Sequence, residues 1–273
     1  MHDIRPGQSV ESLKELHILT RDGRMNQDSR RKQKQISHLF QFIEPILQDI
    51  QREQGSIHLV DHGAGKSYLG FILYDLYFKK NAGCGHIYGI ESRPQLVEKS
   101  SELARRLGFS GMSFCNLTVA ESIGSALLPG RIDIVTALHA CDTATDDALR
   151  FALAKGAPHI LLVPCCQAEV AALLNRNKQR MLPQPLAELW RHPLHTREFG
   201  SHVTNVLRCL QLEAHGYHVR VTELVGWEHS MKNELIVARQ QHRPWRKAAE
   251  RLHLLLEMFG LQELQGRFFT PAL

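Results

Sequence analysis

The sequence predicts an α/β fold: a seven-stranded, mostly parallel sheet with helices on both faces and an antiparallel last strand. Short β-rich stretches recur with helical patterns between them, at residues 57–61, 86–91, 112–116, 131–138 and 159–164. Such alternation is typical of parallel strands joined by helices that cover both faces of the sheet. Two later strand-like segments, 217–225 and 233–239, are separated by a turn, and we expect them to form an antiparallel pair.

The composition is that of a soluble globular protein. The chain has 273 residues, 43% of them hydrophobic and 22% charged, which is enough for one large core with additions. No apolar run reaches the roughly 20 residues that a membrane-spanning helix needs. The start, residues 1–16, lacks the apolar block of a secretory signal. We therefore expect a cytoplasmic protein without membrane contact, and the sequence leaves its oligomeric state open.

Two helical segments are predicted in detail. Between Ser92 and Gly108, we expect the serine to cap the helix start and the glycine to end it. The apolar face of this helix consists of Leu96, Val97, Leu103, Ala104 and Leu107. Residues 67–80 are apolar nearly all round, so this helix should be the most deeply buried.

The pattern along the chain predicts one domain with additions. Residues 1–55 are expected to form an N-terminal helical cap, and residues 56–240 the domain that contains the sheet. A helical insertion is expected near residues 168–215 within that domain, and a C-terminal helical extension over residues 241–273.

The stretch VDHGAGKSYLG, residues 60–70, combines parts of several ligand-binding loops. A phosphate-binding P-loop needs a glycine five positions before the glycine of GKS, and that position is Val60. A dinucleotide fingerprint would place its third glycine at position 68, which is Tyr68. What remains is an acidic residue at a strand end, Asp61, followed by Gly63 and Gly65, whose backbone a ligand can approach closely.

The next predicted strand ends in Glu91, about one βα unit later. A carboxylate at this point can accept hydrogen bonds from both ribose hydroxyls of an adenosine. Together with Asp61 and the two glycines, this predicts S-adenosylmethionine (SAM) as the ligand. The alternative is a glycine turn flanked by two solvated acids, because short motifs also match by chance.

Three stretches of the chain together resemble the SAM-dependent methyltransferase domain of one family. They are VDHGAGKSYLGFILYDLY, TALHACDTATDDALRFAL and HILLVPCCQAE, which carry the motifs GAGKS, LHACD and PCC. Relatives include methyltransferase-like proteins and, in animals, a domain fused to a glutathione-transferase C-terminal-like domain; a tRNA 2′-O-methyltransferase is more distant. The likeness spans about residues 30–240 and implies a class I methyltransferase with a Rossmann-like sheet.

The resemblance implies which residues hold SAM: Asp61, Gly63, Ala64, Gly65 and Glu91. We expect His62, Ser92 and Leu138, which adjoin these residues or end the fourth strand, in the same site. Ser67 stands where many methyltransferases have a third glycine, which leaves the position of the methionine part of SAM open.

Candidate catalytic residues follow the fourth and fifth strands, because ligands of open α/β sheets lie beyond the carboxyl ends of the strands. His139 is expected to face the transferable methyl group, where it can take a proton from a nucleophilic acceptor. The alternative is a histidine that only binds a loop carbonyl. Asp142 is a second candidate, although capping of the helix that follows it is the favoured interpretation.

Cys165 and Cys166 suggest a sharper hypothesis. Cytosine-5 RNA methyltransferases carry a nucleophilic cysteine after the corresponding strand, but the Pro-Cys pair that they have after the fourth strand is replaced here by Ala140 and Cys141. We therefore expect both cysteines to shape the acceptor pocket. No metal is expected, because the usual CxxC spacing of zinc sites is absent.

The acceptor is predicted to be RNA. The formal charge is +5 and the pI is about 8.9, and a basic block of Arg30, Arg31, Lys32 and Lys34 precedes an apolar stripe of Ile36, Leu39, Phe40 and Ile43. A solvated helix face is the alternative interpretation of the basic block. For the whole chain, a protein methyltransferase and a non-catalytic SAM-binding interaction module remain the alternatives.

Overall fold

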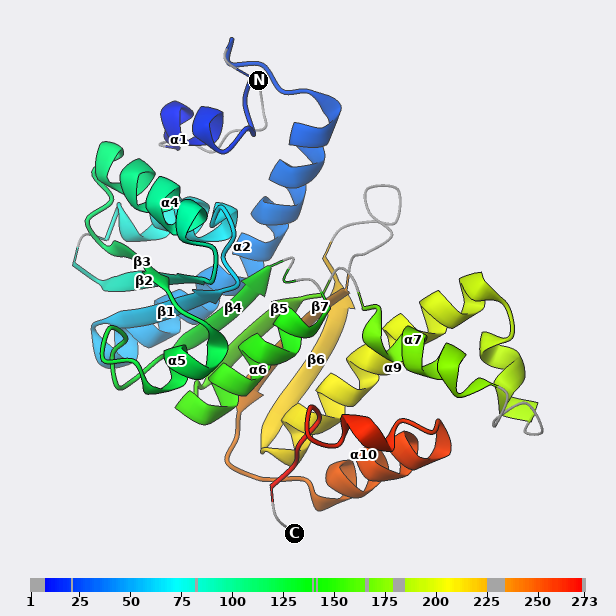
Figure 1. Ribbon diagram of the computed structural model, residues 1–273. Coiled ribbons are helices and arrows are strands. Elements are labelled where there is room, and N and C mark those ends of the chain that lie inside the picture. Colours follow the sequence, from blue (N-terminus) through cyan, green and yellow to red (C-terminus); the bar gives the residue numbers. More distant parts are fainter. Residues whose placement is uncertain are drawn as a thin grey trace.

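The computed structural model describes residues 8–20, 22–81, 83–138, 140, 142–164, 167–178, 185–224 and 234–271, without the side chains of Asp28, Arg31 and Lys32. The described residues contain one seven-stranded sheet with the order β3-β2-β1-β4-β5-β7-β6 (Figure 1). Its strands are β1 (Ile57–His62), β2 (Gly85–Glu91), β3 (Met112–Asn116), β4 (Ile134–Leu138), β5 (His159–Val163), β6 (Tyr217–Glu223) and β7 (Glu234–Gln240).

The sheet confirms the predicted fold class. Neighbouring strands from β3 to β5 pair in parallel, whereas β7 runs antiparallel to both β5 and β6. All seven predicted strands exist, and most of their ends agree within two residues. The exception is β4, which begins at Ile134, three residues later than predicted; Arg131 and Asp133 form an ion pair of 2.7 Å ahead of the strand.

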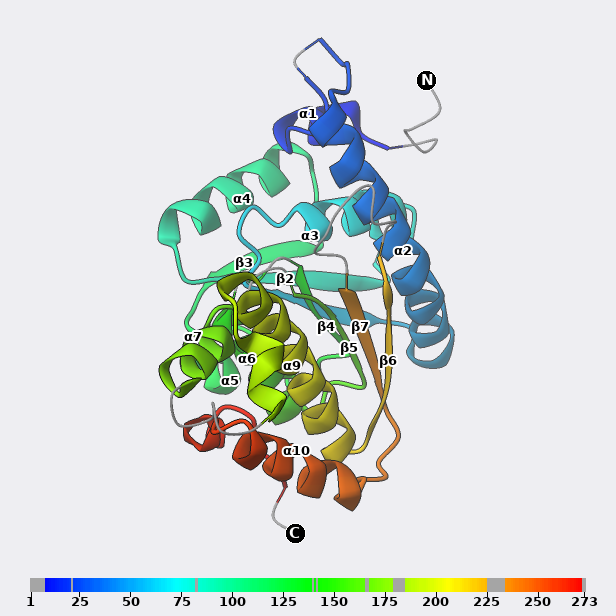
Figure 2. The ribbon, with the colours of Figure 1, turned by 90° about the vertical axis from the view of Figure 1, so that its right-hand side faces the viewer.

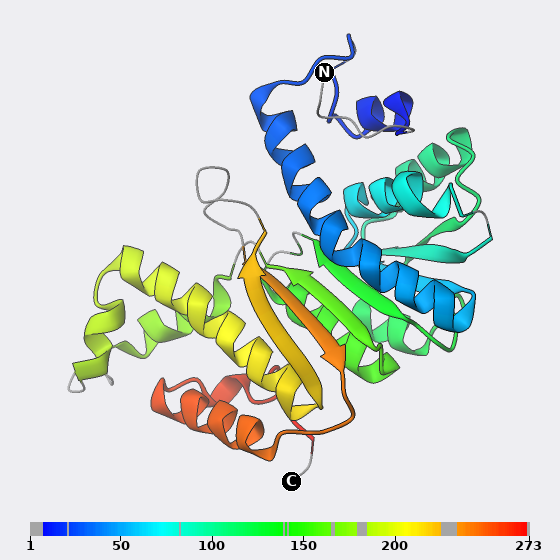
Figure 3. The same cartoon turned by 180° about the vertical axis from the view of Figure 1, so that it is seen from behind.

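Helices cover both faces of the sheet. The helices are α1 (Val10–Glu15), α2 (Gln27–Gln54), α3 (Tyr68–Leu73), the π-helix η1 (Tyr74–Phe78), α4 (Pro94–Arg106), α5 (Val119–Gly124), α6 (Thr143–Lys155), α7 (Glu169–Arg176), the 3-10 helix η2 (Pro185–Trp190), α9 (Pro193–Ala214), α10 (Arg246–Met258) and the 3-10 helix η3 (Gln262–Leu264). Because strand side chains alternate, Leu59 packs into the core with α2 and α3, and Val60 into the core with α6. Figures 1 and 3 show these two faces, with α6 before the sheet in one and α2 in the other.

The long helix α2 forms where the apolar stripe predicts it. Asn26 caps its start by accepting a hydrogen bond from the Ser29 N–H at 2.8 Å, and Gly55 ends it with φ of 76°. The four predicted stripe residues, Ile36, Leu39, Phe40 and Ile43, are buried in the core that α2 shares with α1, α3 and the sheet. The first half of α2 extends beyond the carboxyl ends of β4 and β6, the edge at which ligands of α/β sheets bind (Figures 1 and 3).

The segment from Tyr68 to Phe78 is as deeply buried as predicted, but it is not one regular helix. An α-helical turn and a half passes into the wider η1 at Tyr74. The hydroxyl of Tyr74 accepts a hydrogen bond from the Gly111 N–H at 3.0 Å, which ties this helix to the start of β3.

The predicted start of α4 is wrong by one residue. The helix begins at Pro94 with Arg93 at the cap position, and the Ser92 hydroxyl donates to the Glu91 carboxylate at 3.5 Å instead of capping. A proline in the first turn suits this start, since the first helical N–H groups have no intrahelical partner. Gly108, with φ of 68°, lies just past the end of the helix as predicted.

The helices after β5 pack around a core of their own. Trp190 is fully buried there among residues of α7, α9 and α10. A Cβ atom at Gly200 of α9 would lie 2.7 Å from Cα and Cβ of Ala171, so only glycine lets α7 and α9 approach this closely. Figure 2 shows α10 lying beside α9, on the side of the molecule away from α1. No helix in the described part of the chain is long and apolar enough to cross a membrane.

Candidate functional site

The glycine loop after β1 makes a tight turn against the end of β2. Gly63 and Gly65 have φ of 67° and 58°, and the Ala64 N–H donates to the Ile90 carbonyl at 2.9 Å. Ser67, which stands where the resemblance leads one to expect a third glycine, also has a positive φ, 49°. The loop therefore holds three left-handed residues within five positions, which brings its backbone to the carboxyl edge of the sheet.

Asp61 lies beneath this loop and explains how a serine adopts the strained conformation. Its carboxylate is buried and accepts hydrogen bonds from the hydroxyls of Ser67 and Thr136, each at 3.1 Å. Burial raises the pKa of Asp61 to about 6, against the lowering effect of these bonds. Asp61 thus supports the loop from below, and its carboxylate is occupied by protein donors.

Glu91 is the buried anion of the site. Its oxygens accept from the Gly65 N–H at 2.8 Å, from the Arg93 N–H at 3.0 Å, and from Nε and Nη2 of the Arg93 side chain at 2.9 and 3.0 Å. The Arg93 side chain is the main cause that lowers the pKa of Glu91, so this carboxylate is ionised at neutral pH. Sequence reasoning missed Arg93, although its place two residues after Glu91 was a usable signal.

A cavity of about 530 Å³ opens beside Glu91 and the glycine loop. It is lined by His62, Gly63, Ile90, Glu91, Ser92, Arg93, Leu117, Thr118, Val119, Ala140, Ala144 and Asp147. Four predicted cofactor residues, His62, Gly63, Glu91 and Ser92, are therefore brought together on its wall. Ala64 and Gly65 lie in the adjoining loop, and Leu138, at the end of β4, packs against the core on the α2 face.

The cavity has walls that the sequence analysis did not anticipate. One is the segment Leu117–Val119 after β3, where Thr118 and Glu121 form a capping box that starts α5. The other is Asp147 on α6, whose pKa is raised chiefly by burial. Thr118, a capping residue two positions after the end of β3, was a local signal for the first wall, whereas Asp147 is one of several acids at the start of α6.

Asp142 caps a helix, but not the one predicted. Its Oδ1 atom accepts from the N–H groups of Ala168 and Glu169, at 2.9 and 3.2 Å, at the start of α7. It makes no side-chain cap to α6, since its backbone, with φ of 52° and ψ of −120°, differs from the extended conformation of most N-cap residues. His139, Cys165 and Cys166 lie outside the described residues, as does Cys141.

A buried polar network surrounds this side of the sheet edge. Arg208 of α9 is fully buried and donates to both carboxylate oxygens of Asp146, at 2.6 and 3.0 Å, and to the Asp142 carbonyl at 3.0 Å. Asn205 accepts from Arg208 and from Gln167, and its amide donates to Glu234 at the start of β7. The network thus links α9 to the turns after β4 and β5.

Two members of the predicted basic block can be located. Arg30 and Lys34 are exposed in the first turns of α2, the part of the helix that extends beyond the strand ends. The side chains of Arg31 and Lys32 lie outside the described residues.

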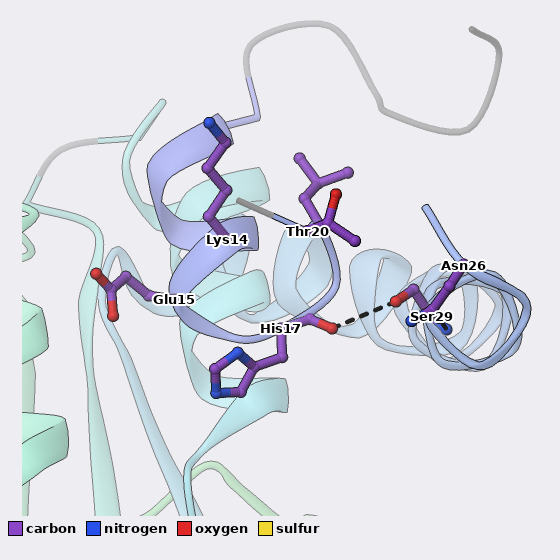
Figure 4. Close-up of a pocket in the computed structure, with 7 residues that line it drawn as sticks. Lys14, Glu15, His17, Thr20, Asn26 and Ser29 are labelled. Carbon is purple, nitrogen blue, oxygen red and sulfur yellow. Dashed lines mark hydrogen bonds between the residues drawn. The ribbon is translucent and has the colours of Figure 1, made fainter. Parts of the chain in front are cut away.

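A second cavity, of about 520 Å³, lies between α1, the loop after it and the start of α2 (Figure 4). Two of its polar side chains already bind within the protein: Glu15 pairs with Arg106 at 2.5 Å, and the Ser29 hydroxyl donates to the His17 carbonyl at 3.4 Å. It includes neither a loop glycine nor a strand end among its lining residues, Lys14, Glu15, His17, Leu19, Thr20, Asn26 and Ser29. No group of three His, Cys, Asp or Glu residues in the described ranges could hold a metal ion.

Comparisons with known proteins agree with this architecture. A family profile described as a methyltransferase domain matches residues 31–173, just over half of the chain. No curated protein sequence matches.

Among solved structures, magnesium protoporphyrin IX methyltransferase from Synechocystis PCC 6803 with bound S-adenosylhomocysteine (SAH) is 13% identical, with 85% of this chain and 95% of that chain covered and a TM-score of 0.46. Fibrillarin from Aeropyrum pernix in complex with SAM is 13% identical, covering 67% of this chain and 66% of that one, with a TM-score of 0.40. A SAM-dependent methyltransferase from Aquifex aeolicus is 17% identical, covering 71% and 88%, with a TM-score of 0.39.

The seven-stranded sheet with its antiparallel β7 and the family match over half of the chain lead to one assignment. The chain belongs to the methyltransferase domain family and is an enzyme that uses S-adenosylmethionine.

Proposed function

We propose that the cavity beside Glu91 is the SAM site. The observation that carries this proposal is a buried, ionised carboxylate next to a glycine loop at the carboxyl edge of β1 and β2. The ribose hydroxyls would donate to Glu91, and the cofactor would lie along Gly63, Ala64 and Gly65. Ser92 and Leu138 border the same edge. The residues fit the cofactor, since the loop glycines have no side chain that would fill the space above their backbone.

The chain contributes binding and orientation, and SAM supplies an electrophilic methyl group. Asp61 and Thr136 hold the loop from below, so that its backbone keeps one conformation when the cofactor binds. His139 follows β4 and is proposed to take the proton of the acceptor. Cys165 and Cys166 follow β5 and are proposed to shape the acceptor pocket.

The acceptor is proposed to be RNA. Support comes from the net charge of +5 and from the exposed basic start of α2, which extends past the edge where SAM would bind. Lysine and arginine side chains there can contact phosphates as an RNA strand approaches the methyl group. In this proposal residues 1–55 act as a helical cap of the site, residues 168–215 as an insertion of the methyltransferase domain at 56–240, and residues 241–273 as an extension.

Methyl transfer from labelled SAM to separate RNA and protein fractions of a cell extract tests the acceptor. The variant with Arg30, Arg31, Lys32 and Lys34 changed to Gln should bind RNA more weakly and with a shallower salt dependence, because each lost phosphate contact removes about 0.7–0.9 from the slope. A variant with Arg243, Arg246, Lys247 and Arg251 changed to Gln is the matched control, since it removes the same charge around α10.

Both variants should keep the parent's affinity for SAH. Label found only in protein would contradict the RNA proposal. So would equal losses of RNA affinity in the two variants, because net charge and not the basic start of α2 would then govern binding.

A further inference from the structure

The last two strands of the sheet leave one of their faces open. Figure 3 shows β6 and β7 beside α2, with no helix of the described residues in front of them. The side chains agree, because His218, Arg220 and Arg239 on these strands are all exposed. These three residues are here called the open basic face.

The open basic face lies on the α2 side of the sheet. Side chains of a strand point alternately to the two sides of a sheet. Arg239 alternates in step with Leu235 and Val237, which pack into the core with α2. His218 and Arg220 lie directly opposite Arg239 and Val237, and so share this side.

The carboxylates of the same two strands point the other way. Glu223 and Glu234 fall at the alternate positions and therefore lie on the α9 side, where Glu234 accepts a hydrogen bond from Asn205 at 2.8 Å. On the open side, β6 and β7 thus present two arginines and no carboxylate.

The cations of the open basic face are crowded. Arg239 lies opposite His218 on one side and opposite His159 of β5 on the other. Arg220 is the diagonal neighbour of Arg239, because it pairs with Val237. Like charges on neighbouring strands destabilise a sheet, so this arrangement favours an anion bound between them.

The described residues supply no such anion. Neither arginine forms an ion pair or a side-chain hydrogen bond within the part of the chain that the structure describes. The nearest acids lie towards β5. The pKa of His159 is lowered, chiefly by burial and then by the Arg239 charge, and Asp133, Asp49 and Glu53 act against this shift. The acids therefore border the open basic face at β5 and leave β6 and β7 positive.

We infer that the open basic face is a second RNA-binding surface, which holds phosphates of the acceptor strand away from the methylated nucleotide; this rests on the proposed RNA acceptor. Guanidinium groups bind phosphate oxygens in pairs. Arg220 is three residues from the carboxyl end of β6, about 10 Å at 3.3 Å per residue. A strand at the basic start of α2 can thus continue over β6 and β7, on the same side of the sheet (Figure 3).

RNA fits this face better than an acidic protein does. Protein interfaces have an apolar centre. The exposed large apolar residue of β6 is Val221, and it lies on the α9 side, while Val237 on the open side is only partly exposed. Phosphate contacts, in contrast, need cations alone.

Fluorescence anisotropy of a labelled single-stranded oligoribonucleotide, titrated with the full chain at several salt concentrations, tests the inference. The double variant Arg220→Gln, Arg239→Gln should bind the RNA more weakly. The slope of log affinity against log salt should fall by about 1.4, since each phosphate contact of a single strand contributes about 0.7. The double variant Arg220→Lys, Arg239→Lys keeps both charges and should keep the parent's slope.

The double variant Lys99→Gln, Arg105→Gln is the matched control. It removes the same charge from exposed positions of α4, which packs on β2 and β3 at the opposite end of the sheet. Its RNA affinity and salt slope should equal those of the parent. All variants should bind SAH like the parent, because they change surface residues outside the cavity.

The outcomes separate this inference from the proposed acceptor. A parent that does not bind RNA overturns the RNA acceptor, and the open basic face with it. A parent that binds RNA, together with equal slopes in the two Gln double variants, overturns only the open basic face, because net charge would then govern binding. Displacement of the RNA by polyglutamate of matched charge would also overturn it and would assign the face to an acidic protein.

Discussion

The ion pair between Arg93 and Glu91 stands where the cofactor is proposed to bind. The Glu91 carboxylate accepts two backbone N–H bonds, two bonds from the Arg93 guanidinium and a long bond from the Ser92 hydroxyl. A carboxylate offers about four lone-pair positions, so all are used and the ribose hydroxyls have none left. A Cβ atom at Gly65 would lie 3.8 Å from Nη2 of Arg93, so the guanidinium also covers the glycine loop. SAM binding should therefore displace this side chain.

The expected change in SAH affinity on removing the Arg93 side chain follows from how exposed the two partners of the ion pair are. The Arg93 side chain is 64% exposed and that of Glu91 only 7%. Ion pairs with such an exposed partner contribute about 0.2–1 kcal/mol, because solvent screens them and side-chain entropy opposes them. Arg93→Ala should therefore strengthen SAH binding by up to about 1 kcal/mol, roughly fivefold. The two backbone bonds to Glu91 persist, so the loop should keep its shape.

The assay is calorimetric titration of SAH into the parent, Arg93→Ala and Glu91→Ala. The Glu91 variant should lose about 1–3 kcal/mol of binding free energy, since it removes the ribose acceptor itself. Arg105→Ala, an exposed position in the last turn of the same helix, is the control and should bind like the parent. If Arg93→Ala binds SAH more weakly than the parent, the guanidinium stays in place and helps to hold the cofactor, and the displacement is refuted.

Three further predictions follow from other features. Because burial raises the pKa of Asp61 to about 6, the free energy of unfolding of the parent falls as the pH rises through that value. The free energy of unfolding of Asp61→Asn, measured by thermal unfolding, should thus exceed that of the parent by about 1–3 kcal/mol at pH 7.5 and by less at pH 5. A difference between variant and parent that does not change with pH would contradict this. Arg208→Ala leaves Asp146 buried without its partner and should cost about 3–5 kcal/mol in urea unfolding. Arg197→Ala, which removes an exposed ion pair with Glu198, is the control, and its free energy of unfolding should stay within about 0.5 kcal/mol of that of the parent. Equal losses in the Arg208 and Arg197 variants would refute the special role of the buried pair. The variants Cys165→Ser and Cys166→Ser should retain methyl transfer. Covalent catalysis would be established instead if a variant lost methyl transfer while still binding SAH, and if the parent formed an RNA adduct that survives denaturation.

Features with a local signal were predictable from the sequence. The strands, the buried helix after the glycine loop and the end of α4 at Gly108 all follow from hydrophobic pattern and glycine placement over a few residues. The capping roles of Ser92 and Asp142 could not be predicted in this way, because a cap depends on the backbone angles of the residue as well as on its type.

Parts of the site that join distant segments were not predictable. Arg208 and Asp146 are 62 positions apart in the sequence, and Arg208 lies outside the three stretches that carry the resemblance. The role of Asp61 also changed, since its carboxylate was expected at the ligand and is used by Ser67 and Thr136. Pattern analysis locates the strand ends, but which side chains bond one another beyond those ends depends on the packing of the whole domain.

The buried pair of Arg208 and Asp146 affects how the chain can be divided. The region shared with the methyltransferase family, residues 31–173, contains Asp146 and ends before Arg208. A fragment cut at that boundary would keep a buried carboxylate and lose its cation. During synthesis the carboxylate of Asp146, in the first turn of α6, would likewise lack its cation until α9, about 60 residues later, has been made. The last third of the chain is therefore part of the folding unit of the catalytic domain.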